Sequence, residues 1–153
     1  MSILIYFILG LLTSLLFPPY FFLPLGFIIF PSLCFLLESN KENYSDKNIF
    51  NKFSIFGFGC FISYLFWIKN PFFVFEETKI FFLVFLLLII FLSVILGLIF
   101  TIIFKLGKKI PIIILIPLMF TSSEYIISIF FYGFPWFTFS LLLSSNELSL
   151  IHI

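Results

Sequence analysis

The feature that most constrains this chain is the run over residues 80–104, which holds twenty-five consecutive positions without a charged side chain. At 1.5 Å of rise per residue, a helix of this length reaches about 37 Å. That is enough to cross the roughly 30 Å hydrocarbon core of a bilayer with some tilt. The run therefore predicts a membrane-spanning helix.

The composition extends this prediction to the whole protein. The chain is 63% hydrophobic and only 10% charged, whereas soluble domains carry about 25% charged residues. Its net charge of +1 comes without a basic stripe, so nucleic acid is not an expected partner. Cys34 and Cys60 lie in apolar runs with no CxxC pair or histidine neighbour, and we expect two small buried side chains rather than a metal site or a disulfide. No cofactor is predicted.

The remaining apolar runs predict an all-α, polytopic transmembrane helix bundle of about five spans, forming one domain over residues 1–153. The runs are separated by prolines or by charged segments, and segments 38–52 and 69–79 are expected to be loops. Gly57 and Gly59 should mark a packing face, because small residues let membrane helices approach closely. The five spans are expected at residues 3–17, 20–37, 53–68, 80–104 and 110–131.

The distribution of lysines predicts the orientation of the bundle. With a cytoplasmic N-terminus, segments 38–52 and 105–109 hold six of the eight basic residues, and the opposite side holds only Lys69 and Lys79. The positive-inside rule favours this arrangement. It places on the outer face three turns rich in aromatic residues and proline, for which we expect a shared site: Pro18-Pro19-Tyr20, residues 67–77 and Gly133-Phe134-Pro135-Trp136.

Glu124 is a lone carboxylate inside the fifth predicted span. On a helix it shares one face with Thr121, Ser128 and Tyr132, at spacings of three and four residues. An ionisable group at the centre of a membrane helix costs roughly 3 kcal/mol, which makes it a functional candidate; a glutamate that snorkels to water is the plainer alternative. It could accept a proton, bind a head-group amine or hydrogen-bond within the bundle, and its hydroxyl neighbours favour the last role.

No catalytic residue is predicted in this chain. His152 stands next to the last residue, where we expect a solvated terminal side chain. The adjacent carboxylates Glu76 and Glu77 are expected to solvate a loop, and Trp136 taken alone is typical of an interfacial aromatic belt. The sequence contains no phosphate-binding loop, no GxSxG elbow and no nucleophile paired with a base.

Several short motifs follow one another in a specific order: Phe17-Pro18-Pro19-Tyr20, Leu23-Pro24, Gly57-Phe58-Gly59 leading to Trp67, and Glu124 nine residues before Gly133-Phe134-Pro135-Trp136. This order resembles the membrane region of apolipoprotein N-acyltransferase over nearly the whole chain. The spacing from the glutamate to GFPW is the most specific part. The chain departs from the family pattern at Ile127, where an arginine is common, and at residues 140–143, which replace a GYSQ-like segment.

The resemblance implies a bacterial inner-membrane enzyme of lipoprotein biosynthesis. This enzyme transfers a fatty acyl chain from a phospholipid to the amine of an N-terminal diacylglyceryl-cysteine, so the implied partners are phospholipid and a diacylated lipoprotein. In the family, a nitrilase-like domain carries a Cys nucleophile, a Glu base and a Lys at the oxyanion. We expect that domain to be missing here and this chain to be an inactive fragment. The resemblance implies supporting, lipid-side roles for Glu124, Gly133, Phe134, Pro135 and Trp136, together with Tyr20 and Trp67.

Two interpretations without acyl transfer stay open. A small membrane transporter or channel subunit would use Glu124 as its coupling or selectivity group, and it would place that carboxylate on a water-filled path. A non-catalytic membrane assembly factor would have no site at all.

Overall fold

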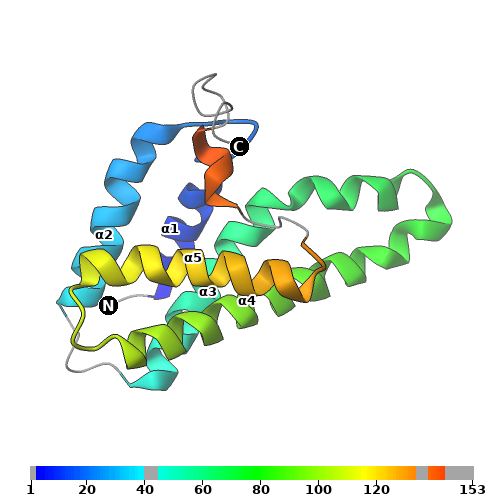
Figure 1. Ribbon diagram of the computed structural model, residues 1–153. Helices are drawn as coiled ribbons and strands as arrows, with labels where there is room; N and C mark the ends of the chain where they lie inside the picture. The colour runs from blue at the N-terminus through cyan, green and yellow to red at the C-terminus, as the bar shows by residue number, and fades with distance from the viewer. Residues whose placement is uncertain (1–2, 40–44, 134–137, 144–153) are drawn as a thin grey trace.

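A computed structural model describes residues 3–39, 45–133 and 138–143 of the chain. These residues form five α-helices, which are α1 (Ile3–Ser14), α2 (Gly26–Glu38), α3 (Asp46–Tyr64), α4 (Phe82–Leu106) and α5 (Ile112–Phe130). Four short 3-10 helices complete them: η1 (Leu23–Leu25), η2 (Phe66–Phe73), η3 (Glu76–Phe81) and η4 (Phe139–Leu143). No strand occurs in the described ranges, and the predicted all-α helix bundle is confirmed (Figure 1).

The helices differ in their capacity to cross a membrane. The continuous helix Glu76–Leu106, formed by η3 and α4, has 31 residues, and α5 has 19; both are long and apolar enough to span. The pair formed by α3 and η2 counts as a third if it is one span bent by 51°. The segments Ile3–Ser14 and Leu23–Glu38 are shorter apolar helices. These elements correspond in order to the five predicted spans.

Two of the predicted loops turn out to be partly helical. In segment 38–52, α3 already begins at Asp46, because the Ser45 hydroxyl caps it by accepting a hydrogen bond from the Asn48 backbone N–H at 3.3 Å. Lys52, expected in that loop, is buried in α3 with its Nζ 5.6 Å from the centre of the Tyr6 ring. Segment 69–79 likewise belongs mostly to η2 and η3. Both segments were predicted to be loops because they contain charged residues. The helix cap at Ser45 and the aromatic contact of Lys52 stabilise helical structure in the first of them in spite of that charge.

Helices α1, α3 and α4 pack through glycines at backbone distance. A Cβ at Gly10 of α1 would overlap the Phe56 carbonyl oxygen of α3, and one at Gly59 would lie 2.5 Å from the Phe7 carbonyl oxygen. On the other side of α3, a Cβ at Gly57 would lie 2.9 Å from Leu96 of α4. Gly57 and Gly59 therefore both lie at close helix contacts, as predicted, but they mark two packing faces of α3 rather than one.

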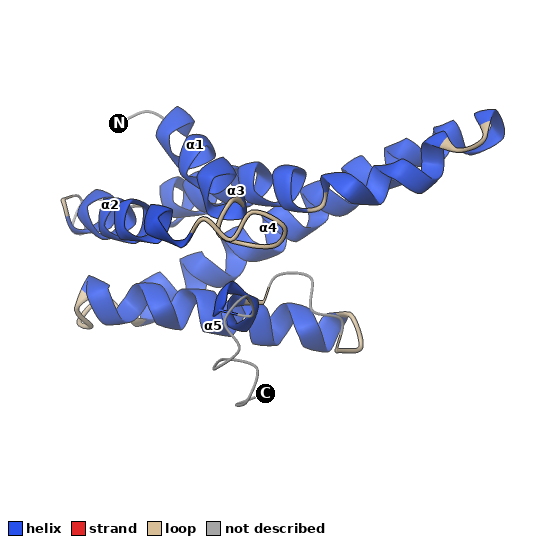
Figure 2. Cartoon of the chain, turned by 90° about the horizontal axis from the view of Figure 1, so that it is seen from above, coloured by secondary structure: helices blue, strands red, loops and turns tan. Residues whose placement is uncertain are grey.

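The fifth helix forms a layer of its own. In Figure 2, α5 lies across from α2 and α3, and it contacts α2 and α4. Its buried residues face these helices, among them Met119 and Phe120, whereas Tyr125 and Ile129 are exposed. Phe120 contacts Phe56 of α3 and Phe100 of α4 through ring pairs 5.9 and 5.0 Å apart. Phe120 thus makes aromatic contacts across the space between the two layers, among mostly aliphatic buried residues of α5.

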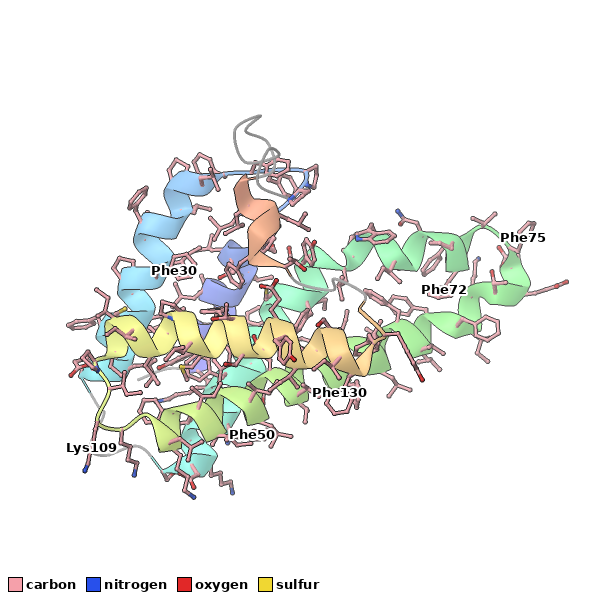
Figure 3. All side chains as sticks on the ribbon, in the orientation of Figure 1. Phe30, Phe50, Phe72, Phe75, Lys109 and Phe130 are labelled. Carbon is pink, nitrogen blue, oxygen red and sulfur yellow. The ribbon has the colours of Figure 1, made fainter. Side chains whose placement is uncertain are left out.

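The connections of the bundle separate into two groups. Lys105 at the end of α4 pairs with Asp46 at the start of α3 at 2.8 Å, which brings two of the lysine-rich segments together. Figure 3 shows Lys109 and further side-chain nitrogens at this end. Elsewhere, Phe17, which follows α1, packs against Tyr64 and Phe139 with ring centres 5.1 and 5.4 Å apart. The lysine-rich connections and the aromatic ones thus gather in different places.

Candidate lipid-side site

Glu124 of α5 is held by one hydrogen bond among the described residues. It is half-buried, and its Oε2 accepts a hydrogen bond from the backbone N–H of Phe139 at 3.2 Å. Phe139 begins η4, fifteen residues further along the chain. The bond ties η4 to the side of α5. Of the roles considered for this carboxylate, the structure shows the hydrogen bond within the bundle, with a backbone amide rather than a neighbouring hydroxyl as the donor.

The polar stripe expected around Glu124 is shorter than predicted. Thr121 donates to the Pro117 carbonyl, and Ser128 donates to the Tyr125 carbonyl at 2.9 Å, so both hydroxyls bond to the backbone of α5 itself. Tyr132 was expected to continue the stripe, and this expectation is wrong because it lies beyond the end of α5.

The end of α5 has a definite geometry. Tyr132 adopts a left-handed backbone with φ of 55°, and its N–H bonds to the Ile129 carbonyl. The Gly133 N–H bonds to the Ser128 carbonyl at 2.7 Å. This pair of bonds is the Schellman pattern that ends many helices, with Tyr132 at the left-handed position. The chain therefore turns at Tyr132 and Gly133, the second of which is the first residue of the GFPW motif.

Phe139 occupies the centre of an aromatic cluster. Its ring centre lies 5.4 Å from that of Phe17, 4.9 Å from that of Phe120 and 6.2 Å from that of Phe30. Edge-on and tilted pairs of this kind contribute about 0.5–1.5 kcal/mol each beyond area burial. The cluster joins the turn after α1, helices α2 and α5, and η4, so it holds together parts of the chain that are far apart in sequence.

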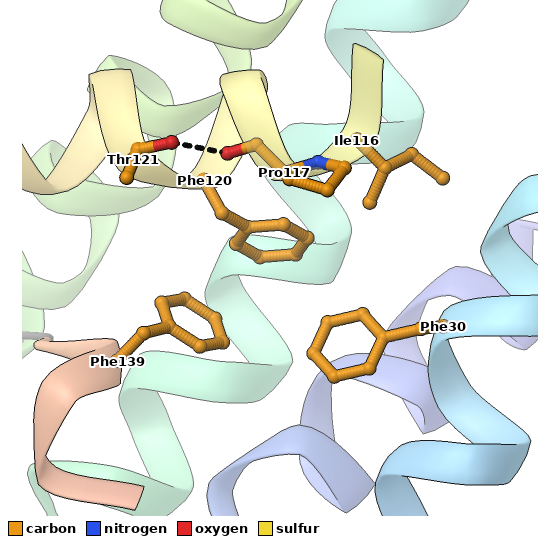
Figure 4. Close-up of a pocket in the computed structure, with 6 residues that line it drawn as sticks. All are labelled: Phe30, Ile116, Pro117, Phe120, Thr121 and Phe139. Atoms are coloured by element: carbon orange, nitrogen blue, oxygen red, sulfur yellow. Dashed lines mark hydrogen bonds between the residues drawn. The ribbon is translucent and has the colours of Figure 1, made fainter. Parts of the chain in front are cut away.

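An apolar pocket of about 300 Å³ opens beside this cluster. Figure 4 shows the rings of Phe30, Phe120 and Phe139 converging on it from α2, α5 and η4. Among the described residues of the lining, Thr121 supplies the one side-chain hydroxyl, and this hydroxyl is already bonded to the Pro117 carbonyl. A pocket of this size lies at the small end of ligand sites. The described residues that line it are Phe30, Ile116, Pro117, Phe120, Thr121 and Phe139.

Of the remaining predicted site residues, the structure describes Tyr20, Trp67 and Gly133. Tyr20 is exposed in the turn between α1 and η1, and Trp67 is exposed in η2, which extends away from that turn (Figure 1). Gly133 is exposed with φ of 84° and has open space around it. Phe134, Pro135 and Trp136 lie outside the described residues.

Sequence reasoning missed the aromatic residues that form the pocket. Phe30, Phe120 and Phe139 stand in apolar runs of a chain with 28 phenylalanines, so no compositional signal distinguishes them. Phe17 belongs to the proline-aromatic turn on which the resemblance drew, and it is fully buried, whereas Tyr20 of the same turn is 67% exposed. The proline-aromatic turn does contribute to the cluster, but through the buried Phe17, which contacts Phe139, and not through the exposed Tyr20.

The thiols are placed as structural groups rather than as part of this pocket. Cys60 is buried as predicted, and Cys34 is only half-buried; both are free. In the ranges that the structure describes, no group of three His, Cys, Asp or Glu side chains could hold a metal ion. The chemistry that the site offers is therefore apolar binding beside one anchored carboxylate.

These observations define an all-α membrane protein with an aromatic pocket, one wall of which belongs to η4 and is held by a hydrogen bond between Glu124 and the backbone. Comparison with protein families identifies the chain further. Residues 9–152 match the family described as apolipoprotein N-acyltransferase N-terminal domain, and the chain belongs to that family. The comparisons with curated proteins and with solved structures found no match.

Proposed function

We propose that this chain is the membrane region of an enzyme that transfers a fatty acyl chain from phospholipid to the α-amino group of an N-terminal diacylglyceryl-cysteine on a lipoprotein. Membership of the family supports the reaction class. The observation that carries the role of the membrane region is the bond from the Phe139 N–H to Glu124, which fixes η4 as one wall of an apolar pocket.

In this proposal the covalent steps belong to a nitrilase-like domain with the family's Cys, Glu and Lys. Transfer through a thioester requires a thiolate that both a base and the substrate can reach. Cys60 is fully buried inside the helix bundle and is a poor candidate. Residues 1–153 therefore contribute lipid handling, and we expect them to be inactive by themselves.

The pocket suits one acyl chain. Lipid tails are as apolar as the pocket walls, so transfer of a chain from the bilayer brings little hydrophobic gain, and selectivity must come from shape. Phe30, Phe120 and Phe139 supply that shape as rigid rings. Because Glu124 already accepts the Phe139 N–H, its proposed role is to position η4 rather than to react.

We further propose that the protein lies in the bacterial inner membrane with its N-terminus in the cytoplasm. The pairing of Lys105 with Asp46 supports placing segments 38–52 and 105–109 at one membrane face, in line with the positive-inside rule. A reporter that is active only in the cytoplasm, fused after Phe137, should give little signal. Strong signal from this fusion would reverse the orientation.

The function is tested with the purified chain in phospholipid vesicles. With a diacylated lipopeptide as acceptor, we expect no acyl transfer by residues 1–153, and turnover would show that the chain contains its own nucleophile. Binding is measured separately with a phospholipid that carries a photoreactive acyl chain. Labelling at Phe120, whose side chain is buried beside the pocket, should saturate and be competed by unlabelled phospholipid.

Leu87 provides the matched control for the labelling experiment. It lies on α4, is 65% exposed and should contact bulk lipid, so its labelling should rise in proportion to the probe without saturating. Glu124→Leu, which removes the acceptor for the Phe139 N–H, should weaken saturable labelling at Phe120 and leave Leu87 unchanged. Identical, non-saturable labelling at Phe120 and Leu87 would show that the pocket is not a specific binding site for an acyl chain.

The transporter alternative gains no support from the surroundings of Glu124. A coupling carboxylate needs a polar path, whereas the described residues of the neighbouring pocket are apolar except for Thr121, whose hydroxyl is already bonded. Solute flux into vesicles that depends on Glu124 would revive this alternative.

A further inference from the structure

Residues 66–81, here called the arm, contain η2 and η3 and project beyond the rest of the bundle (Figure 1). The arm is a closed structure rather than a loose loop. Its two sides are joined by the ring pair Phe72–Phe81 at 6.3 Å, and the Thr78 hydroxyl donates to the Phe72 carbonyl at 3.0 Å. Phe73 also contacts Phe82 at the start of α4, with ring centres 5.6 Å apart. The arm therefore presents a defined outer surface.

That outer surface is apolar on more than one side. A 3-10 helix has three residues per turn, so side chains three apart share a side. In η2, Trp67, Asn70 and Phe73 share one exposed side, and Pro71 lies exposed on another. Large apolar side chains that are at least half exposed occur along the whole arm: Phe66 53%, Trp67 60%, Phe73 50%, Val74 67%, Phe75 67%, Ile80 69% and Phe81 51%.

The charges of the arm cancel. It contains Lys69 and Lys79 against Glu76 and Glu77, which gives a net charge of zero. Lys79 pairs with Glu76 at 2.6 Å, and the Lys69 Nζ lies 3.4 Å from the centre of the Phe66 ring. Four ionised groups are costly at the centre of a bilayer, yet this much exposed aromatic surface is unusual in water. The environment that accepts both is the boundary between lipid head groups and acyl chains.

We propose that the arm lies in this boundary as an aromatic anchor on the lipid surface, with its rings among the upper acyl chains and its charged groups among the head groups. A protein partner would cover one side, whereas lipid covers every side, and the exposed rings are spread over more than one. η3 continues α4 as one helix, and η2 turns by 51° from α3 to pack beside η3, so the arm extends from the outer end of the span. Because the arm carries no net charge, zwitterionic lipid is sufficient for this contact.

This placement also fixes the depth of the longest helix. If Lys79 lies among the head groups, the uncharged residues 80–104 begin at the outer boundary of the hydrocarbon core, and Lys105 emerges at the other side. The inference concerns position in the membrane and does not depend on acyl transfer. Its test can fail while the proposed function stands, and the reverse also holds.

The chain contains two tryptophans, so Trp136→Phe leaves Trp67 as a single fluorescent reporter in the arm. The full chain with this substitution is reconstituted in phosphatidylcholine vesicles whose lipids carry bromine either near the glycerol backbone or near the acyl chain ends. We expect blue-shifted Trp67 emission, stronger quenching by the shallow bromines than by the deep ones, and weak quenching by acrylamide in water. Replacing part of the lipid with anionic phosphatidylglycerol should leave this order unchanged.

A reporter deeper on α4 provides the matched control. Leu87→Trp in a Trp67→Phe, Trp136→Phe background should show the opposite order, with stronger quenching by the deep bromines. Quenching of Trp67 by acrylamide would place the arm in water and overturn the proposal. Quenching mainly by deep bromines would place it in the hydrocarbon core, and protection from all three quenchers would mean that a protein surface covers it. If the relative strength of quenching changed with the phosphatidylglycerol content or with salt, the contact would depend on charge and this part of the proposal would be wrong.

Discussion

The two halves of the bundle are packed by different means. Helices α1 and α3 meet backbone to backbone at Gly10 and Gly59, and Gly57 of α3 packs closely against Leu96 and Ser93 of α4. Helices α2 and α5 meet through aromatic rings, with Phe30 and Phe120 6.0 Å apart in an edge-on pair. The first half leaves no room at these contacts, while the second encloses a pocket of about 300 Å³.

The difference shows how one small bundle combines a rigid support with an adaptable site. Backbone contact through glycine forms only one arrangement, because a single added methyl group collides with a carbonyl. Rings can tilt within a cluster and leave space between them. In this protein the closely packed half can serve as the frame, and a ligand would enter the aromatic half.

The largest expected effect is at the glycine contact between α1 and α3. Gly10→Ala would place a Cβ against the Phe56 carbonyl oxygen, which cannot move without shifting α3. We expect a loss of stability of about 3 kcal/mol, at the upper end for overpacking, seen as a lower unfolding temperature by circular dichroism in detergent. Gly26→Ala is the control, since its Cβ would meet nothing closer than 3.6 Å. Equal tolerance of both changes would mean that the two halves do not differ.

A smaller effect is expected in the aromatic half. Phe139→Ala removes three ring contacts from a half-buried position and enlarges the pocket. We expect a loss of about 2 kcal/mol, below the range for a fully buried phenylalanine. Saturable labelling by the photoreactive phospholipid should weaken at the same time. Phe35→Ala, at an exposed position of α2, should leave stability and labelling unchanged.

The glutamate that holds η4 should contribute less again. Glu124→Ala leaves the Phe139 N–H without its acceptor, which should cost about 1–2 kcal/mol. Glu124→Gln keeps a carbonyl oxygen at the same position and should recover most of this loss. The comparison is made by thermal unfolding of the three proteins in the same detergent. If the glutamine variant is as unstable as the alanine variant, the negative charge rather than the hydrogen bond matters.

The smallest effect belongs to the ion pair between Asp46 and Lys105. The hydrogen bond from Lys105 lowers the pKa of the Asp46 carboxyl, and the same bond raises the pKa of Lys105. The stabilisation is therefore complete above the unfolded pKa of Asp46 and is lost as the pH falls through its lower folded value. It is also lost in strong alkali, as the pH rises through the folded pKa of Lys105.

Because both groups are exposed, Asp46→Asn should shift the unfolding temperature only slightly at neutral pH. That shift should vanish in acid and in high salt. Glu38→Gln, at another exposed acid with no ion pair among the described contacts, is the control. A shift that persists in acid would assign the effect to the helix start rather than to the pair.

The sequence alone was sufficient for the architecture. Uncharged runs, prolines and lysines located five helical segments, because the cost of charge and of unbonded backbone in a bilayer leaves few other solutions. Gly57 and Gly59 were found for the same reason: small residues have a specific use between membrane helices. The errors fell where tertiary contacts decide, as with Lys52, which is buried next to Tyr6.

The site could be predicted only in part. Glu124 was selected because its charge is costly in an apolar run, and the structure gives it a bonded partner. That partner could not be predicted, since any residue except proline offers the same N–H. The pocket rings could not be predicted either: Phe120 differs from the exposed Phe130 only in the side of α5 on which it lies.

The unequal lengths of the helices have a consequence for the bilayer around the protein. Helix α1 has 12 residues and is about 18 Å long, whereas the uncharged residues 80–104 of the longest helix reach about 37 Å. Hydrophobic mismatch of this size thins the membrane beside the short helices and tilts or thickens it beside the long one. Since α2 is also short and borders the pocket, lipids on that flank would have less ordered tails than lipids elsewhere around the protein. The uneven hydrophobic thickness of the protein would thus disorder the acyl chains of the lipids that lie next to the pocket.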